Sequence, residues 1–129
     1  MADRSNDWFK QATRNLEQAE ASRNEGRHEW ACFAGQQAAE LAVKALHLKM
    51  GQEAWGHSVA RLLTELPVAP SNDLVDRGRV LDNFYVPTRY PNGHPEGPPF
   101  HHYGELQSNE AIEHARTIIE YVSSQMAES

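Results

Sequence analysis

The segment from His28 to Met50 constrains the fold more than any other part of the chain, because it is apolar on two sides. One stripe at helical spacing consists of Trp30, Ala34, Leu41, Ala45 and Leu48. A second stripe consists of Ala39, Val43, Leu46 and Met50. A helix that is apolar on two sides and rich in alanine needs close neighbours on both. The sequence therefore predicts that residues 28–50 form the central helix of a helical domain.

Four further segments show the same three- to four-residue spacing of apolar side chains, without the strict alternation that indicates a strand. They cover residues 6–24, 58–66 and 71–85, and a last stretch that starts near Ser108. Ser58 and Ser71 stand where a serine hydroxyl caps the first turn of a helix. The pattern predicts an all-α, up-and-down antiparallel bundle of about five helices. A chain of 129 residues has the length of one domain, which we expect to span residues 1–129.

A long loop is expected before the last helix, from about Val86 to Gln107. It holds five of the chain's seven prolines, which interrupt helices. Its aromatic side chains predict an ordered loop that packs against the bundle. Three histidines lie in it: His94, His101 and His102. Adjacent histidines rarely ligate one ion together and no cysteine accompanies them, so we expect neither a metal site nor a cofactor here.

The formal charge of −6 comes from 12 Lys and Arg against 18 Asp and Glu. It argues against a DNA-binding protein, because non-specific binding depends on basic side chains that neutralise phosphates. Brief binding of RNA is compatible with it. The polar N-terminus shows no secretory signal, and no apolar stretch is long enough to span a membrane. A lone cysteine, Cys32, is typical of the reducing cytoplasm, where we expect the protein.

Polar side chains recur at helical spacing on one face of the central segment: Gln37, Glu40, Lys44 and His47. Glu40 precedes Lys44 by four positions, the favourable orientation for an ion pair. Two interpretations stay open. The four residues form either a stripe in contact with solvent or a polar seam that faces a partner subunit or the long loop.

The two-sided central segment also predicts self-association. A bundle of this size gains stability when it hides a second apolar face. We therefore expect a homodimer that buries part of the helix at 28–50 or of the helix at 71–85. The chain's three tryptophans are large apolar anchors, and we expect at least two of them in the core: Trp8, Trp30 and Trp55.

Arg89 and His94 are the candidate catalytic pair, five positions apart in the long loop. A guanidinium stabilises charge that develops on a phosphate, and an imidazole transfers protons near neutral pH. Cleavage of RNA without a metal uses both kinds of group. The simpler interpretation is that Arg89 anchors the loop, through carbonyl groups or Asp82, and that His94 is merely exposed.

A polar cleft is expected near this pair, close to a dimer axis. We assign four substrate-binding residues to it: Glu40, Lys44, His57 and Tyr90. Lys44 and His57 can meet phosphate groups, and a tyrosine can stack on a base. The chain has no glycine-rich phosphate loop of the Walker or Rossmann type.

Four pieces of the sequence, in this order and at this spacing, resemble the HEPN domain family, named for higher eukaryotes and prokaryotes nucleotide binding. They are Trp8 in the first helix, residues 36–46 (QQAAELAVKAL), Gly56-His57-Ser58, and Arg89-Tyr90-Pro91. The resemblance covers nearly the whole chain and fits the stand-alone prokaryotic form. It implies a helical bundle that pairs as a homodimer.

Some HEPN proteins are toxins that are paired with small nucleotidyltransferase antitoxins. They cleave RNA through an arginine followed, after four to six residues, by a histidine. Carried over to this chain, the pattern falls on Arg89 and His94, and implies a metal-independent endoribonuclease. Tyr90 follows the arginine here, where a small polar residue is common in the active enzymes. The alternative is a non-catalytic dimeric module that binds a nucleotide or a separately encoded nucleotidyltransferase.

Overall fold

The computed structural model describes residues 3–128 and contains five α-helices and two short 3-10 turns. The elements are α1 (Ser5–Asn24), α2 (His28–Lys49), α3 (Val59–Thr64), α4 (Asn72–Asp82), η1 (Pro91–Gly93), η2 (Pro99–His101) and α5 (Glu105–Glu128). No strand occurs among these residues. The predicted all-α bundle of five helices is confirmed. No helix in the described part of the chain is long and apolar enough to cross a membrane.

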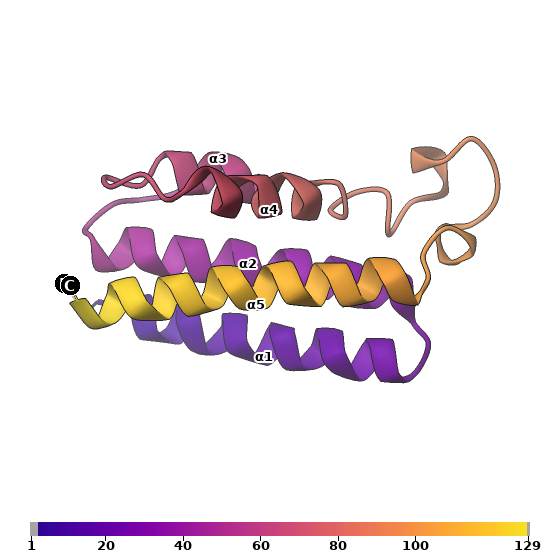
Figure 1. Ribbon diagram of the computed structural model, residues 1–129, viewed down its shortest axis with the longest axis horizontal. Helices are drawn as coiled ribbons and strands as arrows, with labels where there is room; N and C mark the ends of the chain where they lie inside the picture. The colour runs from indigo at the N-terminus through magenta and orange to yellow at the C-terminus, as the bar shows by residue number, and fades with distance from the viewer. Residues whose placement is uncertain (1–2, 129) are drawn as a thin grey trace.

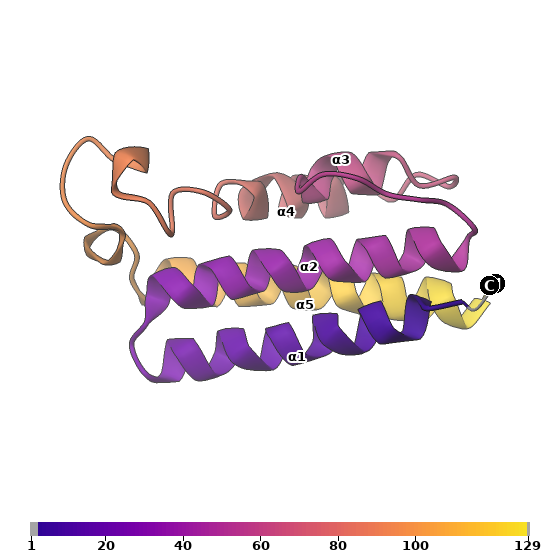
Figure 2. The ribbon, with the colours of Figure 1, turned by 180° about the vertical axis from the view of Figure 1, so that it is seen from behind.

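The three long helices lie side by side, and α2 and α5 run in the same direction, opposite to α1 (Figure 1). Together α3 and α4 form an antiparallel hairpin on the far side of α2 and α5 from α1 (Figure 2). The connection 50–58 runs back along α2 before α3 begins, as Figure 2 also shows. The central helix α2 contacts each of the other four α-helices.

Alanine is the commonest residue on the buried face of the central helix. Ala31, Ala38, Ala39, Ala42 and Ala45 are all fully buried. Small side chains let the neighbouring helices approach closely, and α5 contributes Ala111 and Ala115 to the same contact. The prediction of a central, closely surrounded helix at 28–50 is confirmed.

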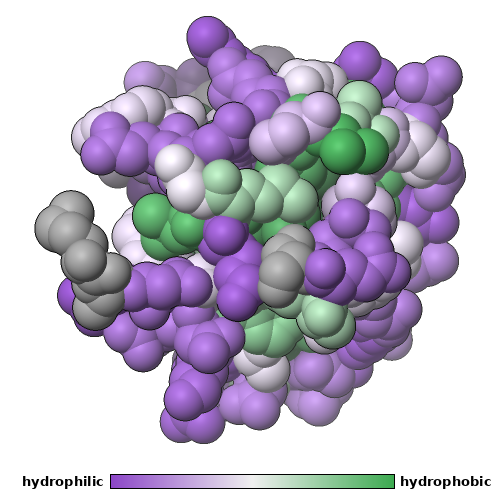
Figure 3. Space-filling model, turned by 90° about the vertical axis from the view of Figure 1, so that its left-hand side faces the viewer, coloured by the Kyte–Doolittle hydropathy of each residue, from purple (hydrophilic) through white to green (hydrophobic). Residues whose placement is uncertain are grey.

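The prediction that at least two tryptophans lie in the core is wrong. Trp8, Trp30 and Trp55 are 38%, 48% and 79% exposed. The alanine-lined contacts of α2 leave little room for an indole, so the large rings stay outside. Seen from the end of the bundle where both termini lie, hydrophobic residues remain visible at the surface within a polar rim (Figure 3).

The last helix begins at Glu105, three residues before the predicted start at Ser108. The side chain of Gln107 accepts a hydrogen bond from the backbone N–H of Gly104, 2.9 Å away, and so stabilises an earlier first turn. Ser108 is buried inside the helix, where its hydroxyl lies 2.8 Å from Nδ1 of His28. The two caps predicted earlier in the chain are confirmed: Ser58 accepts from the N–H of Arg61, and Ser71 from that of Leu74.

The hairpin depends on a close approach of α4 to the start of α3 at Gly78. A Cβ atom at this position would lie 2.9 Å from the backbone nitrogen of Ala60 and 3.1 Å from its Cα. Neither backbone atom can move without displacing α3. The absence of a side chain at Gly78 therefore sets the spacing of the two helices.

We predict that Gly78→Ala lowers the free energy of unfolding by roughly 1–3 kcal/mol, because the added methyl group forces the hairpin apart. Chemical denaturation of both proteins measures the difference. Asp76→Ala, at an exposed position of the same helix, is the control and should change stability by less than about 0.5 kcal/mol. Equal stability of Gly78→Ala and the wild type would contradict the close contact.

Candidate functional site

The guanidinium of Arg89 is held at the beginning of the long loop by a backbone carbonyl and by aromatic rings. Its Nε donates a hydrogen bond to the carbonyl of Tyr85 at 2.8 Å. Its Cζ lies 4.3 Å from the ring centroid of Phe33, 4.7 Å from that of Tyr85 and 5.2 Å from that of Tyr90. Of the three guanidinium nitrogens, Nε alone forms a hydrogen bond with the described residues. The two Nη groups are the donors left for a ligand.

His94 is fixed in a different part of the loop. Its Nε2 lies 2.7 Å from the carbonyl oxygen of Pro87, to which it can only donate. Its ring is stacked on His102, with centroids 4.1 Å apart, and meets the edge of Tyr103. The ring is half-buried by these contacts.

Arg89 and His94 share no hydrogen bond or ring contact among the described residues. Arg89 contacts Phe33 of α2, whereas His94 contacts residues near the start of α5. One protomer therefore does not bring the two candidate catalytic groups into contact. Of the predicted cleft residues, Tyr90 is the direct neighbour of Arg89.

A buried carboxylate lies at the middle of α2. Glu40 is 3% exposed. Its oxygens accept hydrogen bonds from Gln36 Nε2 at 3.1 Å, Lys44 Nζ at 3.1 Å and His57 Nδ1 at 3.2 Å. Gln37 Nε2 adds a longer bond of 3.4 Å. A buried charge needs such partners, so the interpretation as a solvated stripe is wrong at Glu40.

The polar face predicted on α2 does not continue as far as its last member, His47. His47 is buried and turned toward α3, where its Nε2 lies 2.8 Å from the carbonyl oxygen of Leu62. Its Nδ1 lies 2.9 Å from the side-chain oxygen of Gln52. His47 therefore fastens the end of α2 to the hairpin, while Glu40 and Lys44 belong to the polar seam.

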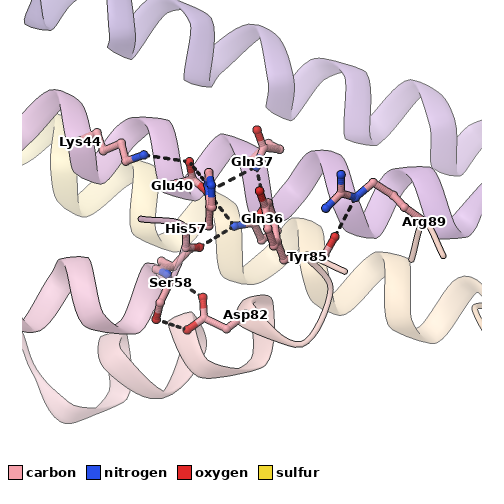
Figure 4. A network of polar contacts seen from close by, with 10 residues as sticks. Gln36, Gln37, Glu40, Lys44, His57, Ser58, Asp82, Tyr85 and Arg89 are labelled. Atoms are coloured by element: carbon pink, nitrogen blue, oxygen red, sulfur yellow. Dashed lines mark hydrogen bonds and ion pairs between the residues drawn. The ribbon is translucent and has the colours of Figure 1, made fainter. Parts of the chain in front are cut away.

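His57 connects the seam to Arg89. Its side chain is 56% exposed, although Nδ1 contacts the buried Glu40. Its ring stacks on Tyr85 with centroids 4.6 Å apart and an interplanar angle of 18°. In Figure 4, Tyr85 lies between His57 and Arg89. The structure thus joins Lys44, Glu40, His57, Tyr85 and Arg89 in one continuous series of contacts.

The backbone is fixed at the carbonyl of His57 and in the two residues that follow it. Gln36 Nε2 donates to the carbonyl of His57 at 3.0 Å. The next residue, Ser58, donates its hydroxyl proton to Asp82 at 2.8 Å, and the same carboxylate accepts the N–H of Val59 at 2.6 Å. The imidazole is therefore positioned by α2 on one side and by the end of α4 on the other (Figure 4).

Sequence reasoning missed Gln36, Phe33 and Tyr85 as members of this site. Gln36 precedes Glu40 by four positions, a spacing that signals a side-chain contact on a helix. Phe33 and Tyr85 gave no such signal, because their roles depend on how the loop returns to α2. No cluster of metal-ligating side chains occurs among residues 3–128.

The fold and the polar seam define a small helical-bundle protein with an arginine in a loop next to its central helix. Comparison with known proteins shows to which family of helical bundles it belongs. The family model of the HEPN domain matches residues 5–125. This chain belongs to the HEPN domain family. None of the curated proteins compared with it gives a match.

Solved structures agree along nearly the whole chain. The protein TT1696 from Thermus thermophilus is 48% identical, with a TM-score of 0.94 over 96% of this chain and 99% of that chain. An archaeal HEPN homologue, ST0689, is 41% identical, with a TM-score of 0.85 over 97% and 99%. A HEPN domain protein from Thermotoga maritima is 31% identical, with a TM-score of 0.77 over 95% and 98%.

Proposed function

We propose that this HEPN protein binds single-stranded RNA through a phosphate group at Arg89. The observation that carries the proposal is the way the guanidinium is held. One nitrogen is fixed by a carbonyl, three rings surround the charge, and both Nη groups are left to bind an anion. Arginine binds phosphate through this kind of paired donor.

The aromatic surroundings of Arg89 favour a single strand as the ligand. Tyr90 is half exposed and Phe33 is only partly buried, so aromatic surface lies open to solvent next to the guanidinium. Base stacking on aromatic side chains next to a cation is the common way to bind single strands. The net charge of −6 disfavours binding along an extended phosphate backbone, and a short contact at one arginine avoids this repulsion.

We predict that Arg89→Gln weakens binding of a short single-stranded oligoribonucleotide roughly tenfold, because a charged hydrogen bond to phosphate is lost. Fluorescence anisotropy measures the affinity. Arg79→Gln removes an exposed arginine of α4 and should bind like the wild type. Thermal unfolding of each variant separates lost binding from a lost loop structure.

A wild-type protein that binds no RNA would contradict the proposal. The function to pursue would then be the non-catalytic module, which pairs with a separately encoded nucleotidyltransferase.

We also propose that the protein forms a homodimer through the outer face of α2. In Figure 2 this face is turned toward the viewer, and no other helix covers it. Trp30, Ala34, Leu41 and Leu48 lie along it at helical spacing and are exposed or only partly buried. A hollow of about 200 Å³ at one end is lined by Leu48, Trp8 and Trp55, among others. Large apolar side chains of this kind serve as anchors in protein interfaces.

We predict that sedimentation equilibrium gives twice the chain mass of 14.6 kDa for the wild type. Leu41→Glu should shift the protein toward the monomer, because it places a charge in the middle of the apolar face. Leu106→Glu, on the exposed start of α5, is the matched control and should leave the dimer intact. A monomeric wild type at micromolar concentration would contradict the dimer.

Metal-independent cleavage of RNA by Arg89 and His94 is a second candidate function. One observation favours it: Nε2 of His94 is held by the carbonyl of Pro87, which leaves Nδ1 as the nitrogen that can accept a proton. The two side chains share no hydrogen bond or ring contact within a protomer, so a phosphate held by Arg89 would have to lie between them.

We predict that, if the protein is a ribonuclease, His94→Phe abolishes cleavage of single-stranded RNA, while a chelator leaves the wild-type rate unchanged. Phenylalanine keeps a ring against His102 and removes both nitrogens. His101→Ala, at an exposed neighbouring position, should cleave normally. Cleavage at the native rate by a folded, dimeric His94→Phe protein would end the catalytic interpretation.

A further inference from the structure

His57 is oriented by a buried carboxylate, its side chain is 56% exposed, and it is joined to Arg89 through Tyr85. Glu40 contacts Nδ1 of His57 through both oxygens, at 3.2 and 3.3 Å. A carboxylate can only accept hydrogen bonds, so Nδ1 carries a proton. In the neutral imidazole, Nε2 is then a hydrogen-bond acceptor. No contact to Nε2 occurs among the described residues.

We propose that Nε2 of His57 accepts a hydrogen bond from a ribose 2′-hydroxyl of the RNA that Arg89 holds by its phosphate, and so selects RNA over DNA. The inference rests on the RNA-binding function proposed above. The ribose 2′-hydroxyl can donate a hydrogen bond to the unprotonated ring nitrogen, whereas deoxyribose has no hydroxyl at that position. His57 would be the residue that contacts the ligand, and Glu40 a positioning residue.

The placement of the two groups suits one nucleotide. The His57 ring lies 4.6 Å and Arg89 Cζ 4.7 Å from the same Tyr85 ring centroid, so the two groups flank one tyrosine (Figure 4). A ribose and its neighbouring phosphate can span one side chain of this size. Asp82 and Gln36 hold the backbone around His57, so the acceptor is fixed in place before a ligand binds.

The charges around this imidazole come from three elements. Lys44 and Glu40 of α2 form an ion pair at 3.1 Å, and Arg89 lies beyond Tyr85. On the hairpin side, Asp82 is engaged by Ser58 and by the N-terminus of α3. The carboxylate of Glu40 therefore has its own cation, and it fixes the tautomer of His57 without leaving a buried charge unpaired.

The test compares RNA and DNA of the same sequence as single strands, by fluorescence anisotropy. The wild type should bind RNA roughly three- to tenfold more tightly, the effect of one hydrogen bond. His57→Phe keeps a ring on Tyr85 and removes the acceptor, so it should lose the preference while its affinity for DNA stays the same.

Two further variants separate the roles. Glu40→Gln no longer forces the proton onto Nδ1, and should reduce the RNA preference in a folded protein. Arg89→Gln should weaken the binding of RNA and the binding of DNA by the same factor, and so leave the preference for RNA intact. His101→Phe, an exposed histidine of the long loop, is the control and should behave as the wild type.

The outcomes are distinguishable. A wild type that binds both strands equally, or a His57→Phe protein that keeps the preference, would overturn the role of His57 and leave RNA binding at Arg89 standing. A wild type that binds neither strand would overturn both. A large fall in the thermal stability of His57→Phe, without any change in the ratio of RNA to DNA affinity, would show that the Glu40–His57 contact only anchors the connection 50–58.

Discussion

The charge of Glu40, buried in the middle of α2, organises the polar half of this molecule. A carboxylate without water must be satisfied by donors, and they arrive from its own helix and from the connection 50–58. Meeting this requirement draws His57 back along α2. His57 then stacks its ring on Tyr85, whose carbonyl and ring hold Arg89. A single buried charge thus fixes groups that are far apart in the sequence.

The apolar half follows from the small side chains of α2. Because alanines line its buried face, α1 and α5 approach closely, and the large rings are excluded from the centre. The outward tryptophans and the uncovered face of α2 are therefore two results of the same packing. An interior built from small residues leaves the largest apolar groups available for a surface contact.

Periodicity was sufficient to predict the helices, their order and the two serine caps, because these depend on local spacing. Apolar spacing predicts the start of α5 three residues too late, because the side chain of Gln107 caps a turn that this spacing does not mark. Lys44, Glu40, His57 and Arg89 are joined by a series of contacts through Tyr85, and Tyr90 lies beside Arg89, while their role in binding a substrate stays a prediction. The contacts that His94 makes, with Pro87 rather than with Arg89, depend on loop geometry, which spacing in the sequence does not report.

The Asp82 carboxylate links the end of α4 to the start of α3, directly beside His57, and Tyr85 follows α4 within three residues. The two side chains proposed to meet the ligand, His57 and Arg89, consequently flank the α3–α4 hairpin in the chain, while their counterparts, Glu40 and Phe33, belong to α2. The geometry of the whole site therefore depends on how the α3–α4 hairpin is seated against α2.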